Sequence, residues 1–392
     1  MKKEFDDYFR ELKEFCEVEQ YKGYDPFDGL NSKLFKHFDF LNNSRLFKLI
    51  WLQAFKRSPI NFRKVAGIKK EYNPKGLGLF LSGYCILYKQ DPNVVYLEKI
   101  KLLIKEIENC KSIGYSGICW GYNFDWQARA FFQPKGTPSI VVTSFIACAL
   151  LDAYEVTKEE RLLTMARSAC DFVLNDLNRT YDNEGDFAFS YCPVDNTQIF
   201  NASLLGVRLL CRVYQYTKEE ILLSESEKAV SYVCKHQQRD GAWTYSPLPF
   251  HAWIDNFHTG YNLECIYTFQ KISENNKFKS NIENGLNYYL STFFEADGTP
   301  KYYHNKKYPI DLHTTAQLIV TLSKMEIIEQ HKDLVDKVLS WSCVNMFDNK
   351  RGYFYYYKEK YFTIKIPYIR WIQAWMFLGM SHYKTHFYDK KD

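Results

Sequence analysis

The feature that most constrains the fold is an internal repeat in the second half of the chain. Four segments begin with glycine and continue with alternating aromatic residues, at Gly185, Gly241, Gly298 and Gly352. Successive glycines are 56, 57 and 54 residues apart, and a looser copy begins at Gly117. A period of this length indicates a repeat architecture, in which neighbouring units must stack to bury their apolar faces.

Each repeat unit is predicted to contain two helices joined by a short turn, followed by a long glycine-aromatic loop. The apolar periodicity predicts helix pairs over 77–88 with 93–110, 138–155 with 158–177, 197–216 with 218–238, 256–272 with 276–294, and 311–325 with 327–345. A last helix over 366–386 has no downstream partner. The helix around 44–57 is expected to close the ring against it.

The first helix of each pair is more apolar than the second, as a comparison of 140–151 with 159–174 illustrates. A ring of buried helices inside a ring of half-exposed ones explains this difference. An open helical solenoid is the alternative, but six pairs with termini that can meet favour closure. We therefore predict an all-α (α/α)6 toroid of six helical hairpins. Residues 1–392 are expected to form one domain, with the helices of 1–60 packing on or closing the ring.

The loop lengths indicate which end of the toroid carries function. Turns from the first to the second helix of a pair are short, whereas the return connections are long and carry the aromatic residues. Binding and catalytic residues are concentrated on long loops of rigid scaffolds. These loops lead into helix N-termini, whose dipoles favour anionic ligands.

Composition narrows the partner and the compartment. Aromatic residues make up 18% of the chain, and Tyr and Trp line carbohydrate clefts as well as cores. The net charge is only +5 and the basic residues are scattered, so no nucleic-acid partner is expected. No apolar run has membrane-spanning length and the N-terminus lacks a signal-peptide pattern. Eleven cysteines without disulfide-type spacing fit a reducing compartment, so we expect a cytoplasmic protein. The sequence fixes no oligomeric state.

The densest group of reactive side chains lies at the start of one predicted inner helix and recurs one repeat later. Asp255 precedes His258 there, and Asp311 precedes His313 in the next repeat. Asp can act as an acid, a base or a nucleophile, and His can carry protons near neutral pH. An Asp at a helix start often only caps the helix, but capping does not require His. We predict these four residues as the catalytic groups.

Two further segments, 119–129 and 369–375, are unusually polar and aromatic for connections or core helices. Their indole and phenol faces can stack on sugar rings, while their amide and charged groups can bind hydroxyls or a carboxylate. Aromatic core filling with an ion pair is the alternative. The predicted substrate-binding residues are Trp120, Tyr122, Asp125, Trp126, Arg129, Asn201, Trp243, Tyr245, Trp253, Asn256, Tyr261, Arg370 and Trp371.

No cofactor and no metal site is predicted. Phosphate-loop, dinucleotide and nucleophile-elbow motifs are missing from the sequence. His382 and His386 have the spacing of metal ligands on a helix, but the sequence supplies no third ligand for them.

Several of these motifs resemble those of the VpsJ-type polysaccharide biosynthesis proteins. The motifs are 73–79, 120–127, 240–245, 254–261 and 370–375, within a likeness that extends over most of the chain. The resemblance implies a bacterial capsule, exopolysaccharide or lipopolysaccharide context. It also implies an architecture similar to six-hairpin glycosidases, without implying one reaction.

We therefore expect an enzyme of surface polysaccharide biosynthesis that acts on an oligosaccharide or a sugar precursor by acid–base chemistry. A glycoside hydrolase would use two carboxylates, Asp255 with Asp311 or Asp125. An epimerase would use two proton carriers, His258 with His313. A uronate lyase would use Asn256, His258, Tyr261 and Arg370.

Two other classes of function remain open from the sequence. A non-catalytic glycan-binding or scaffold protein of the synthesis machinery would need only the indoles of Trp120, Trp126, Trp243 and Trp253. A terpenoid-type toroid acting on a prenyl chain would need an apolar funnel and an acidic diphosphate motif. The sequence has polar residues at the expected funnel and no D-D-x-x-D motif.

Overall fold

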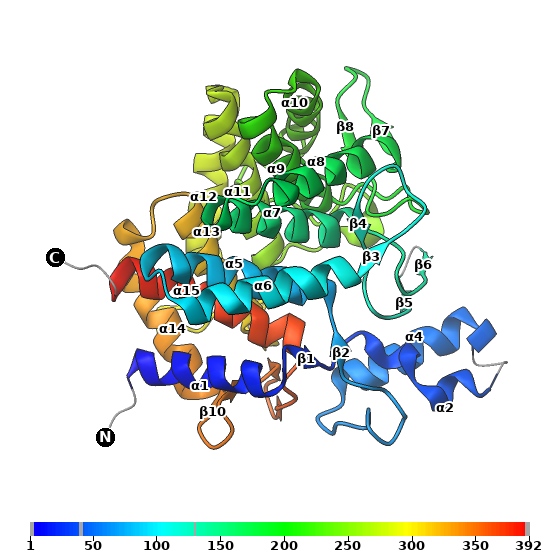
Figure 1. Ribbon diagram of the computed structural model, residues 1–392, viewed down its shortest axis with the longest axis vertical. Coiled ribbons are helices and arrows are strands. Elements are labelled where there is room, and N and C mark those ends of the chain that lie inside the picture. Colours follow the sequence, from blue (N-terminus) through cyan, green and yellow to red (C-terminus); the bar gives the residue numbers. More distant parts are fainter. Residues whose placement is uncertain (1–3, 39–41, 129–130, 389–392) are drawn as a thin grey trace.

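Six helices pack side by side into a closed inner ring in the computed structural model, which describes residues 4–38, 42–128 and 131–388. Each inner helix contacts the next one, and the last contacts the first (Figure 1). The predicted (α/α)6 toroid is therefore confirmed. In chain order the inner helices are α5 (Pro74–Gln90), α7 (Ile140–Thr157), α9 (Phe200–Thr217), α11 (Asn256–Ser273), α13 (His313–Lys324) and α15 (Ala374–Phe387).

Five outer helices each pack on the inner helix that precedes them in the chain. The sixth comes from the other end of the sequence, because α1 (Phe5–Val18) packs on α15 (Figure 1). The chain thus closes its ring by bringing its two ends together. The other outer helices are α6 (Val94–Asn109), α8 (Glu160–Asn175), α10 (Glu220–Lys235), α12 (Lys279–Thr292) and α14 (Lys332–Met346).

The helix expected over 44–57 forms, but it does not close the ring. It is α4 (Arg45–Arg57), which packs on the short helix η1 (Asp28–Asn31) and on a loop strand. Only two side chains of α4 are buried, whereas α1 has an apolar face with three buried residues. On that face Phe9 stacks on Phe377 of α15, with 5.6 Å between ring centroids.

The inner helices are apolar because other helices surround them on nearly every side. All of the first fourteen residues of α7 are buried, and the Ser139 hydroxyl caps its start by accepting from the backbone N–H of Val142. By length and composition α7 could cross a membrane, but 78% of that stretch is buried in the ring. The α5–α15 contact is close because Gly83 has no side chain. A Cβ there would lie 2.6 Å from Cε1 of Phe377.

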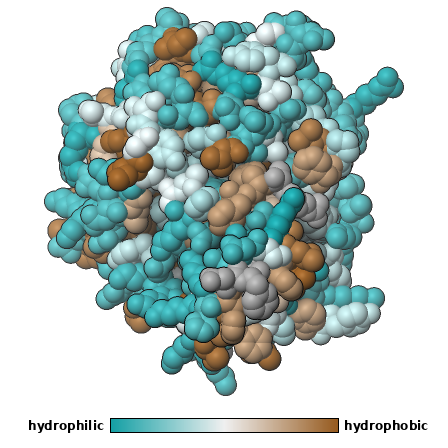
Figure 2. All heavy atoms as spheres, turned by 90° about the vertical axis from the view of Figure 1, so that its right-hand side faces the viewer, coloured by the Kyte–Doolittle hydropathy of each residue, from teal (hydrophilic) through white to brown (hydrophobic). Residues whose placement is uncertain are grey.

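Most connections from an outer helix to the next inner helix carry short antiparallel strands, and β3 to β8 lie together at the right of Figure 1. Figure 2 views this side, where apolar side chains are interspersed with hydrophilic ones. The strands pair as β1 (Lys22–Gly23) with β2 (Glu71–Tyr72), β3 (Lys111–Ser112) with β4 (Cys119–Trp120), β5 (Trp126–Gln127) with β6 (Phe132–Gln133), β7 (Arg179–Tyr181) with β8 (Phe187–Phe189), β10 (Phe347–Asp348) with β11 (Tyr353–Phe354), and β12 (Tyr357–Lys358) between β9 (Ile310–Asp311) and β13 (Thr363–Ile364).

Short helical segments complete the loops. A π-helical turn leads directly into α15, so the helix expected over 366–386 begins in a wider turn. These segments are α2 (Lys33–Lys36), η2 (Pro249–His251), η3 (Asn276–Phe278), η4 (Glu329–His331) and the π turn η5 (Ile369–Gln373).

Candidate active site

A cavity of about 230 Å³ lies where the inner helices begin, and we call it the front cavity. Its wall combines the N-terminal segment, the long loops and the first turns of the inner helices. Ten of the residues predicted from the sequence line it. They are Tyr122, Trp126, Asn201, Tyr245, Trp253, His258, Tyr261, His313, Arg370 and Trp371.

His258 is held by Asp255 at the start of α11. The imidazole Nδ1 lies 2.7 Å from Asp255 Oδ2, and because a carboxylate only accepts, Nδ1 carries the proton. The other carboxylate oxygen caps the helix by accepting from the backbone N–H of His258, and the Trp253 indole also donates to Asp255. Asp255 is buried behind the imidazole and does not line the front cavity. This leaves Nε2 of His258 as the basic nitrogen.

Asp311 holds the corresponding place one repeat later but does not reach a histidine ring. It accepts from the backbone N–H of His313 at 2.9 Å and from the Trp371 indole at 2.7 Å. Burial raises the pKa of Asp311 to about 7, against the lowering effect of the Trp371 hydrogen bond. Asp311 is fully buried and outside the cavity wall, so it orients Trp371 and the start of α13.

His313 pairs with a tyrosine instead. Its Nε2 lies 2.7 Å from the Tyr261 hydroxyl, while its ring stacks on Phe257 and Trp375. Burial lowers the pKa of His313 well below its usual value, and Lys75 adds to this effect. His313 is therefore a neutral imidazole in contact with a protonated phenol, because burial also raises the pKa of Tyr261.

Arg370 lines the front cavity, but it is not a free cation. It forms two hydrogen bonds with the carboxylate of Asp25, at 2.6 and 2.8 Å. Both side chains are about 3% exposed, so the pair ties the N-terminal segment to the π turn η5 that leads into the last inner helix. Arg370 was predicted to approach an anionic group, and in this structure two of its guanidinium nitrogens already donate to the Asp25 carboxylate.

Four predicted substrate-binding residues lie away from the cavity wall. Trp120 and Trp243 are core residues whose indoles donate to backbone carbonyls of the preceding outer helices. Asn256 is buried and accepts from the Tyr289 hydroxyl, and Asp125 forms an ion pair with Lys36 at 3.0 Å. For these residues the alternative of core filling and ion pairing holds. Arg129 lies outside the described residues.

The sequence interpretation missed two lysines on the wall, Lys56 of α4 and Lys75 of α5. Lys75 is the second residue of its helix, where the helix dipole disfavours a cation. A lysine at the start of a helix is the sequence feature that could have indicated a functional role for Lys75. The other missed wall residues are Phe27, Phe124, Val141, Tyr191, Phe257, Tyr302 and Tyr303.

The chemistry of the wall is set by its acids and bases. None of the described residues that line the front cavity is Asp or Glu, whereas two histidines, two lysines and several phenols do line it. Among the described residues, no three His, Cys, Asp or Glu side chains gather as a metal site. His382 and His386, which have metal-ligand spacing, both contact the hydroxyl of Ser323.

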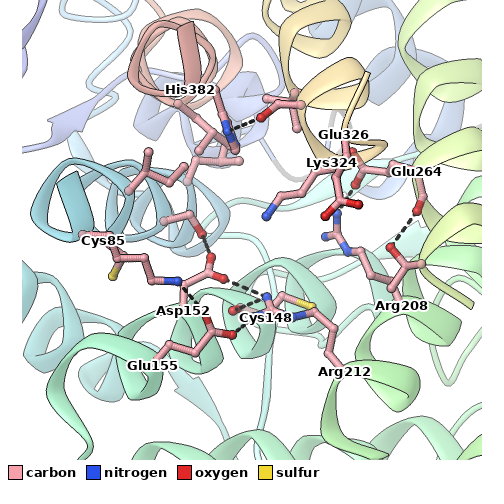
Figure 3. Close-up of a pocket in the computed structure, with 18 of the residues that line it drawn as sticks. Cys85, Cys148, Asp152, Glu155, Arg208, Arg212, Glu264, Lys324, Glu326 and His382 are labelled. Atoms are coloured by element: carbon pink, nitrogen blue, oxygen red, sulfur yellow. Dashed lines mark hydrogen bonds and ion pairs between the residues drawn. The ribbon is translucent and has the colours of Figure 1, made fainter. Parts of the chain in front are cut away.

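A second cavity, of about 570 Å³, lies where the inner helices end, and we call it the rear cavity (Figure 3). Its wall carries ion pairs between neighbouring inner helices. Arg212 of α9 pairs with Asp152 of α7 at 2.9 Å, and Arg208 of α9 pairs with Glu264 of α11. Each of the four carboxylates that line this cavity has a cationic partner. These ion pairs join neighbouring inner helices and so stabilise the ring. The front cavity is therefore the candidate active site.

Comparison with known proteins identifies the fold. No family model and no curated protein matches the sequence. The structure is similar to cellobiose 2-epimerase from Bacillus thermoamylovorans, with a TM-score of 0.64 and 12% identity over 97% of this chain and 100% of that one. A GH76 α-mannanase from Bacteroides thetaiotaomicron has the same TM-score and identity over 96% of both chains. A D-mannose isomerase matches with a TM-score of 0.59 and 10% identity over 80% of this chain and 86% of that one. The chain thus has the six-hairpin toroid fold of these enzymes.

Proposed function

We propose that this chain is a carbohydrate-processing enzyme of the epimerase or isomerase type. It moves a proton on the carbon beside the carbonyl group of an open-chain sugar. The observation that carries the proposal is the Asp255–His258 pair on the wall of the front cavity, with Nδ1 fixed as the donor to Asp255. An imidazole oriented in this way presents Nε2 as a general base.

A second proton carrier stands beside the first. Tyr261 lies one turn after His258 on α11, with 5.9 Å between the ring centroids, and both line the front cavity. Its hydroxyl contacts Nε2 of His313, and this neutral imidazole holds the phenol in place. His258 removes the proton from carbon, the Tyr261 phenol gives its proton to the resulting enediolate, and the phenolate regains a proton from solvent while His258 loses its own.

The two other sugar chemistries have less support. A hydrolase needs two carboxylates across the scissile bond, and no described wall residue supplies one. Asp255 stands behind His258, and Asp311 bonds the Trp371 indole. A uronate lyase would need Arg370 to neutralise the substrate, but Asp25 already pairs with it.

The size and lining of the front cavity suit one sugar unit. Its volume of about 230 Å³ falls below the range of about 300–1,000 Å³ that is usual for drug-sized ligands. Tyr245 stacks on Trp253 at 4.6 Å, and this pair offers an aromatic face beside His258. We further propose that this activity serves surface polysaccharide biosynthesis in the cytoplasm, with a sugar precursor or an oligosaccharide end as substrate. The motif resemblance to VpsJ-type proteins supports the polysaccharide context.

The proposal is tested by incubating the protein with reducing sugars and following the products by NMR. The panel contains D-glucose, D-mannose, N-acetylglucosamine, D-glucuronate and cellobiose. We expect an epimer or a ketose from at least one sugar, and no product with His258→Ala at matched folded concentration. New reducing ends from cellobiose, with no epimer or ketose from any sugar, would replace the proposal by hydrolysis.

A further inference from the structure

Lys75 is a buried amine without a counter-ion. Its side chain enters the front cavity from the second residue of α5, and the residue is only 4% exposed. In the described part of the chain, no carboxylate oxygen lies within 4.0 Å of its Nζ. A buried lysine is ordinarily paired, so this position requires an explanation.

Aromatic rings surround the amine. Nζ lies 4.1 Å from the ring centroid of Phe145, 5.5 Å from that of Tyr261 and 5.4 Å from that of Trp375. These rings can stabilise an ammonium ion, but they supply no negative charge to balance it. On the rear side of Phe145 the Arg208 guanidinium lies 4.8 Å from the same ring, so a second cation opposes the charge on Lys75.

The other cationic residues of the front cavity also leave Lys75 without an anionic partner. Arg370 has its own carboxylate in Asp25, and Lys56 lies over the Phe27 ring at 4.7 Å. With no Asp or Glu among the described wall residues, Lys56 and Lys75 leave the cavity with uncompensated basic groups. A ligand that carries a negative charge would complete this arrangement.

We infer that the front cavity selects an anionic sugar, whose carboxylate or phosphate becomes the counter-ion of Lys75, and that Lys75 takes up a proton from solvent as this sugar binds. The choice of a sugar rests on the proposed function. The anion requirement rests on the unpaired amine and on the absence of carboxylates from the described wall. For each amine that is neutral before binding, one solvent proton and one ligand anion form an ammonium–anion pair, so charge and atoms balance.

The empty cavity disfavours the charged form of the amine. Burial lowers the pKa of Lys75 well below its usual value, and Arg370 and Arg208 lower it further. A bound anion acts in the opposite direction, because an opposite charge at close range favours the protonated form. Affinity is therefore expected to fall as pH rises from the pKa of Lys75 in the empty cavity to its higher pKa in the complex. The titratable groups that face Lys75 are Arg370 of η5, Arg208 of α9, Asp25 of the N-terminal segment, Glu264 and Tyr261 of α11, and His313 of α13.

The test is calorimetric binding of matched anionic and neutral sugars. D-Glucuronate is compared with the uncharged D-glucuronamide, and D-glucose 6-phosphate with D-glucose, so that carboxylate and phosphate are separate arms. Titrations in buffers of different ionisation enthalpy count the protons taken up. Lys75→Met keeps the apolar stem, and Lys337→Met, on the exposed face of α14, is the matched control.

The inference predicts that one anion binds at least about tenfold more tightly than its neutral partner, or about 1.4 kcal/mol. It also predicts net proton uptake when the anion binds. Lys75→Met should lose the anion preference and the proton uptake, whereas Lys337→Met should keep both. Equal affinities, an anion preference that survives Lys75→Met, binding without proton uptake, or no binding of either pair would each overturn the inference. Anion binding with proton uptake but without any sugar conversion would overturn the proposed function alone.

Discussion

His258 donates through Nδ1 to Asp255 over 2.7 Å, and no such bond joins their repeat-related counterparts. Asp311 reaches only the backbone N–H of His313, whose ring turns to the Tyr261 hydroxyl. Two equivalent helix starts thus supply two different groups. One is an imidazole oriented by a carboxylate, and the other is a neutral imidazole linked to a phenol.

Replacing Asp255 should inactivate His258 as a base without removing a side chain from the wall of the front cavity. In Asp255→Asn the amide can donate to Nδ1, which would leave the proton of the imidazole on Nε2 and remove the basic nitrogen. We expect kcat for sugar conversion to fall about 10²- to 10⁴-fold with little change in KM. Asp311→Asn is the matched control, because that carboxylate touches no histidine ring. Equal losses in kcat for the two variants would contradict the assigned roles.

Replacing Tyr261 should separate the two proton transfers. Tyr261→Phe keeps the ring that packs in the wall but loses the hydroxyl that contacts His313. We expect removal of the carbon-bound proton by His258 to continue, so that solvent deuterium still enters recovered substrate while product formation falls at least about tenfold. Mass spectrometry of recovered sugar and NMR of product give the two rates. A parallel fall in both rates would show that one group performs both transfers.

The ion pairs of the rear cavity should contribute to the stability of the protein and not to its activity. Arg208→Met leaves the buried carboxylate of Glu264 without its partner, and such a loss costs about 3–5 kcal/mol of unfolding free energy. Adding Glu264→Leu should restore most of it. Lys271→Met, which breaks an exposed pair with Glu326, should cost less than about 1 kcal/mol. Urea unfolding measures these values, and a harmless Arg208→Met would refute the structural role of the pair.

Asp311 should give the protein a pH-dependent stability. Its pKa of about 7 in the folded chain exceeds the unfolded value of about 3.9, so the folded state binds more protons between these values. The free energy of unfolding should therefore fall as pH rises from about 4 to 7, by as much as about 4 kcal/mol from this group. Asp311→Asn should flatten this part of the curve relative to the parent protein. Curves of identical slope for the two proteins would contradict the raised pKa.

Much of the fold could be predicted because the repeat is visible in local patterns of the sequence. The apolar run of α7 and the regular spacing of the loop glycines indicate stacked helix pairs with buried first helices, for which a closed ring was favoured over an open solenoid. The ring closure could not be placed, because α1 meets α15 through contacts between residues at opposite ends of the chain. The periodicity of 44–57 alone does not distinguish an outer helix from one that packs beside the cavity.

The site was predictable where it depends on helix starts and not where it depends on partners. His258 and His313 stand at first turns of inner helices and do line the front cavity. The role of Arg370 depends on Asp25, which lies 345 residues away in sequence, and no local sequence pattern indicates that pair. The Trp120 and Trp243 indoles look like sugar platforms in sequence, but their N–H groups serve backbone carbonyls in the core.

The role of His258 as the base is tested by deuterium incorporation into a reducing sugar in deuterated water, catalysed by the protein and by His258→Ala. We predict that deuterium enters the carbon beside the carbonyl group with the parent protein and that the rate falls to background in the variant, at an unchanged melting temperature. Incorporation at the same rate in His258→Ala would contradict this role. Sugar conversion by the parent protein without any deuterium in the product would contradict it as well.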